Sequence, residues 1–138
     1  MKPKLAFVEP LLVKIKKDNL YRKMQDVKNK GSYIYIKRKK LLNLCSNDYL
    51  GLSSIRNYSD QLQTSSRLVA GNDVSFDTLE KKLAKHKSQE RSLIFPTGYM
   101  ANLGAISTIV RENDVIFSDE LNHVSIIEAC KLTKAKVL

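Results

Sequence analysis

The segment from Leu93 to Leu138 constrains the fold more than any other feature, because short apolar runs alternate with longer helix-like runs along it. The apolar runs at 93–95, 114–118 and 135–138 predict strands, and the runs at 99–110 and 124–133 predict the helices between them. Strands that alternate with helices form a parallel sheet with crossover helices. This part of the chain therefore predicts an α/β fold.

The stretch Leu93–Asn102, LIFPTGYMAN, predicts a strand that passes directly into a helix. Pro96 ends the strand because it offers no N–H to a sheet, and Thr97 and Gly98 form the turn. The helix that follows begins with free backbone N–H groups and the positive end of its dipole, which favour an anion such as phosphate. Gly98 would let a ligand approach the backbone closely. Such junctions are common in α/β proteins and most bind nothing, so this stretch alone predicts only an anion-ready helix start.

The N-terminal half predicts a smaller, mixed segment. An imperfect apolar stripe predicts a helix over Glu9–Asn29, which Lys30-Gly31-Ser32 would end. The runs 33–36 and 41–45 predict two strands of a hairpin, joined by the basic link 37–40. The remaining predictions are a loop at 46–52, a loop with at most a short helix at 53–66, a turn at 67–72, and a helix from an Asp77/Glu80 capping box to about Lys87.

The net charge of +10 comes entirely from the first 40 residues, which hold 13 Lys and Arg against 3 Asp and Glu. A basic arm on a neutral body could bind nucleic acid or anionic lipid. The charges follow no nucleic-acid motif, however, and a solvated basic surface is the default interpretation. No apolar run approaches the roughly 20 residues that a membrane-spanning helix needs. We therefore expect neither a nucleic-acid nor a membrane partner.

Cys45 and Cys130 are far apart and form no CxxC pair. Two isolated cysteines, with no signal peptide in the N-terminal sequence, predict a reducing, cytoplasmic location. Both thiols are expected to be small, buried apolar groups. The sequence contains no metal-ligand cluster, no nucleotide-binding glycine fingerprint and no nucleophile elbow.

Residues 119–125 follow the predicted strand 114–118, and the carboxyl ends of strands are where open α/β sheets place their sites. If the strands are neighbours, His123 comes near the turn at Thr97 and Gly98. Its imidazole could stack on a flat ring, donate a hydrogen bond, or act as an acid or base. The favoured, simpler alternative is that His123 caps the helix that follows. Ser125 could likewise be an ordinary first-turn helix residue, and Tyr99 could belong to the core.

The chain resembles the α-oxoamine synthases from about Leu20 onward, because four motifs occur in the order and approximate spacing of that family. The motifs are NLCSNDYLGLS (43–53), SRLVAGN (66–72), LIFPTGYMAN (93–102) and DELNHVSIIEA (119–129). Members of the family use pyridoxal 5'-phosphate (PLP) to join an amino acid to an acyl thioester with loss of CO₂. The resemblance implies the N-terminal part of a PLP-dependent transferase of the aspartate aminotransferase-like fold (fold type I). Residues 1–52 would form an N-terminal helix and β-hairpin segment, and residues 53–138 the start of the large PLP-binding domain.

The resemblance also implies roles for individual residues around the cofactor. Gly98 and Tyr99 match the family pair whose backbone holds the PLP phosphate, and Thr97 matches the small hydroxyl residue before it. His123 matches the histidine that stacks on the pyridine ring and helps to stabilise the carbanion, so it is the expected catalytic residue.

Three further residues match positions at the substrate. Asn47 matches a residue that faces the substrate pocket, and Ser125 matches a serine that lines the amino-acid site. Arg22 falls near an N-terminal arginine that contacts substrate carboxylate or acyl groups. The expected substrates are an amino acid and an acyl-CoA or acyl-ACP, and the member that the chain most resembles joins L-alanine to a pimeloyl thioester in biotin biosynthesis.

Two features separate the chain from a complete family member. Thr and Ser occupy 64–66, where the family has glycines. Because of this difference, the resemblance does not define which acyl group the enzyme accepts. PLP enzymes also need a Schiff-base lysine and an acidic partner for the pyridinium nitrogen, which in this family lie beyond position 138. The resemblance therefore implies an N-terminal fragment, inactive alone, of an enzyme that is a homodimer at full length. The alternatives are a sister synthase that uses glycine and a truncated, non-catalytic chain.

Overall fold

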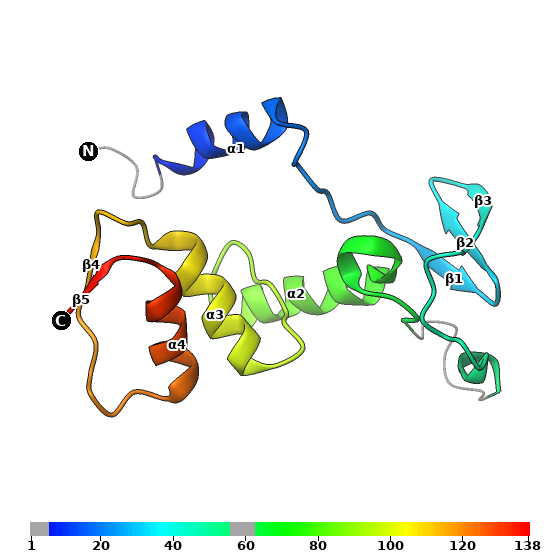
Figure 1. The fold of residues 1–138 in the computed structure, drawn as a ribbon. Helices are drawn as coiled ribbons and strands as arrows, with labels where there is room; N and C mark the ends of the chain where they lie inside the picture. The colour runs from blue at the N-terminus through cyan, green and yellow to red at the C-terminus, as the bar shows by residue number, and fades with distance from the viewer. Residues whose placement is uncertain (1–5, 56–62) are drawn as a thin grey trace. The chain divides into compact units, whose positions relative to one another are not determined.

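The computed structural model describes residues 6–55 and 63–138, which divide into two compact units, Met1–Leu79 and Glu80–Leu138 (Figure 1). The predicted division after residue 52 stays a prediction. The predicted loop over 53–66 lies partly outside the described residues. In chain order the elements are α1 (Val8–Lys17), β1 (Lys28–Lys30), β2 (Tyr33–Ile36), β3 (Lys39–Leu42), the 3₁₀ turn η1 (Leu52–Ser54), the π-helical turn η2 (Arg67–Gly71), α2 (Val74–His86), α3 (Gly98–Ile109), β4 (Val115–Ile116), α4 (Val124–Leu132) and β5 (Lys136–Val137).

The first unit contains an antiparallel sheet in the order β1-β2-β3 (Figure 1). β1 and β2 are joined by Gly31-Ser32, and Gly31 has the positive φ, 56°, that a tight hairpin turn requires. β2 and β3 are joined by Lys37-Arg38, where both residues have positive φ (46° and 70°), as in a type I′ turn. The predicted hairpin is therefore present, although its second strand begins earlier than predicted and ends at Leu42.

The predicted helix over 9–29 is wrong beyond Lys17. α1 ends there, and Asn19 has a positive φ of 56° that does not continue a helix. Further on, the side chain of Asn72 donates to Asp26 Oδ1 at 2.9 Å, and its carbonyl accepts from the Val27 N–H at 2.9 Å. These long-range hydrogen bonds hold the chain out of a helix, whatever its apolar periodicity. Lys30-Gly31-Ser32 is accordingly part of a hairpin and does not end a helix.

A polar cluster around Asn72 forms part of the core of the first unit. Arg67 Nε and Nη2 donate to Asn72 Oδ1 at 3.0 and 2.9 Å, and the Arg67 guanidinium lies 4.2 Å from the centre of the Phe76 ring. Asn72 is 6% exposed and Val27 only 1% exposed. Gly71 fits here because it lacks a side chain, since an added Cβ would lie 1.9 Å from the Ser65 carbonyl oxygen. The predicted turn at 67–72 is thus a short helical turn with a hydrogen-bonded end.

The predicted Asp77/Glu80 capping box is wrong, because α2 begins three residues before Asp77. The cap is Asp73, whose Oδ1 accepts from the Ser75 N–H at 2.7 Å. Glu80 is used elsewhere, because its Oε1 accepts from the Ile94 N–H at 2.9 Å. The predicted strand at 93–95 is also wrong, because these residues are irregular. The Ile94 N–H donates to the Glu80 carboxylate and is therefore not available to a neighbouring strand.

In the second unit, β4 and β5 form a parallel pair, connected by α4 (Figure 1). This confirms the predicted strand–helix–strand crossover, although each strand has only two residues. α3 packs beside α4, and Ala129 and Cys130 are buried between the elements of this unit. Phe95 packs against α3 at Gly104, where an added Cβ would lie 3.1 Å from the ring.

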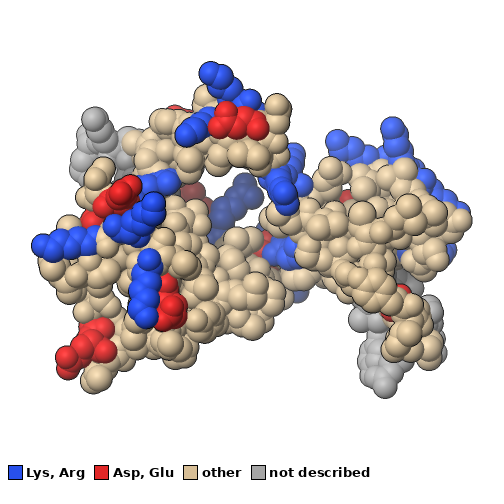
Figure 2. All heavy atoms as spheres, in the orientation of Figure 1, with Lys and Arg blue, Asp and Glu red and all other residues tan. Residues whose placement is uncertain are grey.

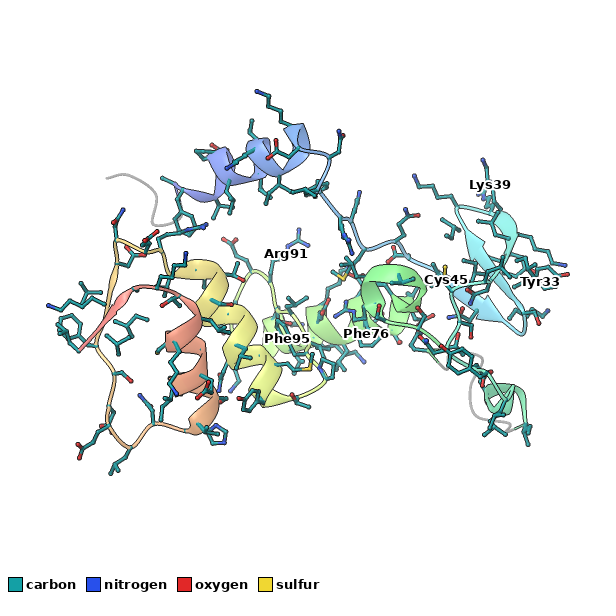
Figure 3. All side chains as sticks on the ribbon, in the orientation of Figure 1. Tyr33, Lys39, Cys45, Phe76, Arg91 and Phe95 are labelled. Atoms are coloured by element: carbon teal, nitrogen blue, oxygen red, sulfur yellow. The ribbon has the colours of Figure 1, made fainter. Side chains whose placement is uncertain are left out.

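The surface carries basic side chains over the three-stranded sheet (Figure 2). Cys45 was predicted to be buried but is exposed, because it lies beyond β3 in a loop where its N–H bonds to Asn43 Oδ1 at 3.1 Å (Figure 3). Within the described ranges no helix has the length and apolar character to cross a membrane. The same residues contain no group of His, Cys, Asp or Glu arranged to hold a metal ion.

Candidate functional site

The first part of the site is the N-terminus of α3. Thr97 is the N-cap, with extended backbone (φ −142°, ψ 154°), and its Oγ1 accepts from the Met100 N–H at 3.1 Å. The Thr97 carbonyl accepts from the Ala101 N–H at 3.1 Å. The N–H groups of Gly98 and Tyr99 belong to the first turn and have no acceptor inside the helix. The predicted helix start is therefore present, and two amides at it are available to a ligand.

The surroundings of Gly98 and Tyr99 are open. An added Cβ at Gly98 would meet no heavy atom of the described residues within 4 Å, so packing among these residues does not explain the glycine. Tyr99 is 41% exposed, so it does not belong to the core. Both observations suit a place where another molecule approaches the backbone.

The second part of the site is the N-terminus of α4. His123 is the N-cap, and its Nδ1 accepts from the Ser125 N–H at 3.2 Å and lies 2.7 Å from Ser125 Oγ. The predicted capping role is thus confirmed. Capping uses only the Nδ1 edge of the His123 ring. The ring is exposed, and its Nε2 has no hydrogen-bond partner among the described residues. Capping and ring stacking are therefore compatible roles for this side chain.

A hydrogen bond joins the two helix starts. Asn102, in the second turn of α3, donates from Nδ2 to Ser125 Oγ at 2.8 Å, and Ser125 is fully buried. The N-terminal turns of α3 and α4 therefore face one another. Asn102 is not among the predicted site residues; its signals in the sequence are its place at the end of the LIFPTGYMAN motif and an amide within a mainly apolar helix.

Lys131 is a surface residue of α4 that lies near Tyr99 of α3. Its Nζ lies 2.8 Å from Glu128 Oε1, and its side chain is 66% exposed. The hydrogen bond to Glu128 and the charge of that carboxylate raise the pKa of Lys131, with a smaller contribution from Tyr99. The ammonium is thus engaged by a neighbour on its own helix.

The two remaining predicted residues belong to the Met1–Leu79 unit. The Asn47 N–H donates to the Thr64 carbonyl at 2.6 Å, and Asn47 Nδ2 donates to Tyr49 Oη at 3.0 Å. Arg22 lies exposed in the irregular segment between α1 and β1, and within the described part of the chain it has no ion-pair partner. An open cavity of about 420 Å³ adjoins Asn47, and the residues that line it are Asn47, Asp48, Ser53, Gln63, Thr64 and Ser65.

The sequence profile of the aminotransferase class I and II family matches residues 39–138. The chain belongs to this family. Among its relatives, the 8-amino-7-oxononanoate synthase of Coprothermobacter proteolyticus is 38% identical over 78% of this chain and 30% of its own length. The resemblance to the α-oxoamine synthases is thereby confirmed. The chain spans about a third of the length of the curated relatives it matches, with 36% for the first of them.

Two solved structures confirm the PLP-dependent transferase fold of this aminotransferase family member. Serine palmitoyltransferase (SPT) from Sphingomonas wittichii is 27% identical, with a TM-score of 0.55, over 99% of this chain and 37% of that one. A variant of SPT solved with PLP is 22% identical, with a TM-score of 0.54, over 99% of this chain and 38% of that one.

Proposed function

We propose that this chain is part of a PLP-dependent acyltransferase, which condenses an amino acid with an acyl thioester and releases CO₂. L-Alanine and a pimeloyl thioester, the substrates of biotin biosynthesis, are the first candidates. The observation that carries the proposal is the pairing of two helix starts, α3 with Gly98 and Tyr99 and α4 with His123, on the motifs shared with the family. The name of the relative from C. proteolyticus supports the choice of substrates.

The residues present fit two parts of PLP. The phosphate would accept from the amides of Gly98 and Tyr99, where the helix dipole favours an anion and the space beside Gly98 is open. The exposed ring of His123 would stack on the pyridine, since its capping bonds use only one edge. Thr97 would hold the helix start in place through its bond to Met100.

The chain's own residues would bind and orient the reactants. When bound, PLP supplies an electron sink for the negative charge that forms on the α-carbon of the amino acid. Ser125 matches a residue of the amino-acid site, but its side chain is fully buried, so it would support that side of the site by holding His123 and would not itself touch the substrate. Asn47 would line the substrate pocket, of which the cavity that adjoins Asn47 would be a part. Arg22 is exposed and cationic, and it would contact a substrate carboxylate or acyl group.

The activity is proposed for a longer protein that contains this chain. The lysine that binds PLP covalently and the acidic residue that pairs with its ring nitrogen would both come from sequence beyond position 138. The 138 residues alone are predicted to be inactive, and the complete enzyme is proposed to act in the cytoplasm as a homodimer with the site at the subunit interface.

A sister reaction is the second candidate, and the likeness to serine palmitoyltransferase favours it. The experiment supplies full-length protein and PLP with L-alanine, glycine or L-serine, each paired with pimeloyl, acetyl, succinyl or palmitoyl thioesters. Release of CO₂ and free thiol is then measured. The first proposal predicts turnover with alanine and the pimeloyl thioester. Turnover with glycine or serine alone would replace it with the sister reaction, and no decarboxylation with any pair would overturn both.

A further inference from the structure

Three polar side chains connect α3 to α4 in the second unit. Asn102 Nδ2 lies 2.8 Å from Ser125 Oγ, and Ser125 Oγ lies 2.7 Å from His123 Nδ1. Ser125 is fully buried, so its hydroxyl depends on these protein partners. The row ends at the exposed imidazole of His123, the residue that would face the cofactor.

The backbone amide of Ser125 determines the direction of these hydrogen bonds. It lies 3.2 Å from His123 Nδ1, and a backbone N–H can only donate. Nδ1 must therefore present its lone pair to Ser125. The Ser125 hydroxyl can then donate to the same nitrogen, while its oxygen accepts from the Asn102 amide. In the neutral imidazole the proton consequently lies on Nε2.

The reverse direction is chemically unfavourable. It would place a proton on His123 Nδ1, facing the Ser125 N–H, so that two donors would meet and the first turn of α4 would lose its cap. It would also leave the buried Ser125 proton without an acceptor in this row, unless the Asn102 amide presented its oxygen to it. The orientation of Asn102 is therefore coupled to the tautomer of His123.

We propose that Asn102 is a positioning residue, which orients the Ser125 hydroxyl and thereby selects the Nε2–H tautomer of His123. The relevance to PLP rests on the proposed function, whereas the tautomer itself is a property of this chain. With Nδ1 engaged, the ring is held at one edge, and both its faces and its Nε2–H are presented outward. Asn102 would act only through Ser125 and would touch neither cofactor nor substrate.

The test is nitrogen NMR of the full-length protein labelled with ¹⁵N-histidine, with PLP removed, at alkaline pH where imidazole is neutral. The His123→Gln variant assigns the signal, and exposed His86 is an internal reference. Wild type should show Nε2–H. Asn102→Asp has the same shape but accepts the serine proton, and Asn102→Ala removes the donor. The aspartate variant should raise the ratio of Nδ1–H to Nε2–H roughly two- to tenfold, the effect of one hydrogen bond, whereas the alanine variant supplies no acceptor for the serine proton and should change the ratio less.

Ser107→Ala is the matched control, because Ser107 is an exposed α3 residue whose hydroxyl donates to the Leu103 carbonyl of its own helix. It should leave the ratio unchanged. A wild-type His123 that carries its proton on Nδ1 would overturn the proposal without any variant. An unchanged ratio in the folded Asn102→Asp variant would also overturn it. A PLP titration of wild type tests the proposed function separately from the positioning role of Asn102. Failure to bind PLP would refute the proposed function and would leave the result on the His123 tautomer intact.

Discussion

Thr97 Oγ1 accepts a hydrogen bond from the backbone nitrogen of Met100 at 3.1 Å, which makes Thr97 the N-cap of α3. This bond uses the third amide of the helix and leaves the first two, Gly98 and Tyr99, facing outward. The helix start is thus held by one side chain while its anion-binding amides remain available. The proposed cofactor site depends on this division.

Removing the Thr97 hydroxyl should destabilise the protein. Thr97→Ala is expected to lower the free energy of unfolding by about 0.5–2 kcal/mol, the usual effect of losing an N-cap. Thr97→Ser keeps the hydroxyl and should restore most of the loss. Urea denaturation measures both. Equal stability of the alanine variant and wild type would show that the cap contributes nothing.

Asn72 should be among the most sensitive polar residues of the first unit. Asn72→Ala removes the acceptor of Arg67 and the donor to Asp26 in a buried place, and should lower the free energy of unfolding by about 1–3 kcal/mol. Asn43→Ala is the matched control, because its bond to the Cys45 N–H is exposed. Urea denaturation should show a clearly smaller effect for the control. Similar effects at the two asparagines would contradict the buried cluster.

The Glu128–Lys131 pair should give a small, pH-dependent contribution to stability. The Glu128 carboxylate raises the pKa of Lys131 above its usual 10.5, so the charged lysine is favoured in the folded state. The contribution is complete below that value and is lost as the pH rises through the raised pKa. Glu128→Gln should therefore lower the melting temperature slightly at neutral pH and not at strongly alkaline pH. Solvent screening keeps the effect small, and a difference that grows with pH would contradict this account.

None of the lysines in these 138 residues is expected to hold PLP covalently. Reduction of the PLP-loaded full-length protein with borohydride should attach the pyridoxyl group to a lysine outside residues 1–138. Peptide mass spectrometry identifies the labelled residue. A label on Lys131 or Lys134 would contradict the expectation, and Lys131→Ala should leave PLP uptake unchanged because its side chain is exposed and paired with Glu128.

Helices and turns that are stabilised by residues close to them in the sequence could be predicted from the sequence. α3 and α4 have local apolar runs and local caps, Thr97 and His123, so their bounds differ from the predicted ones by a residue. The failures involve distant partners. Asn72 holds Asp26 from 46 positions away, and Glu80 holds Ile94 from 14 positions away. No local pattern contains that information.

The candidate site shows the same division. The motifs indicated the residues at the two helix starts, because family motifs are local in sequence. The bond between Asn102 and Ser125 spans 23 positions and joins two motifs, so neither motif alone could indicate it. The buried hydroxyl and the open space at Gly98 likewise became visible only in three dimensions.

The most direct test of the PLP site is a titration of full-length Gly98→Ala with PLP and with pyridoxal, which lacks the phosphate. The added methyl would meet no heavy atom within 4 Å in the described part of the chain, so stability should not fall, but it would enter the space proposed for the phosphate. We predict that affinity for PLP falls about tenfold or more while affinity for pyridoxal hardly changes. Ser107→Ala should bind both as wild type does. A folded Gly98→Ala protein that binds PLP as tightly as wild type would contradict the account.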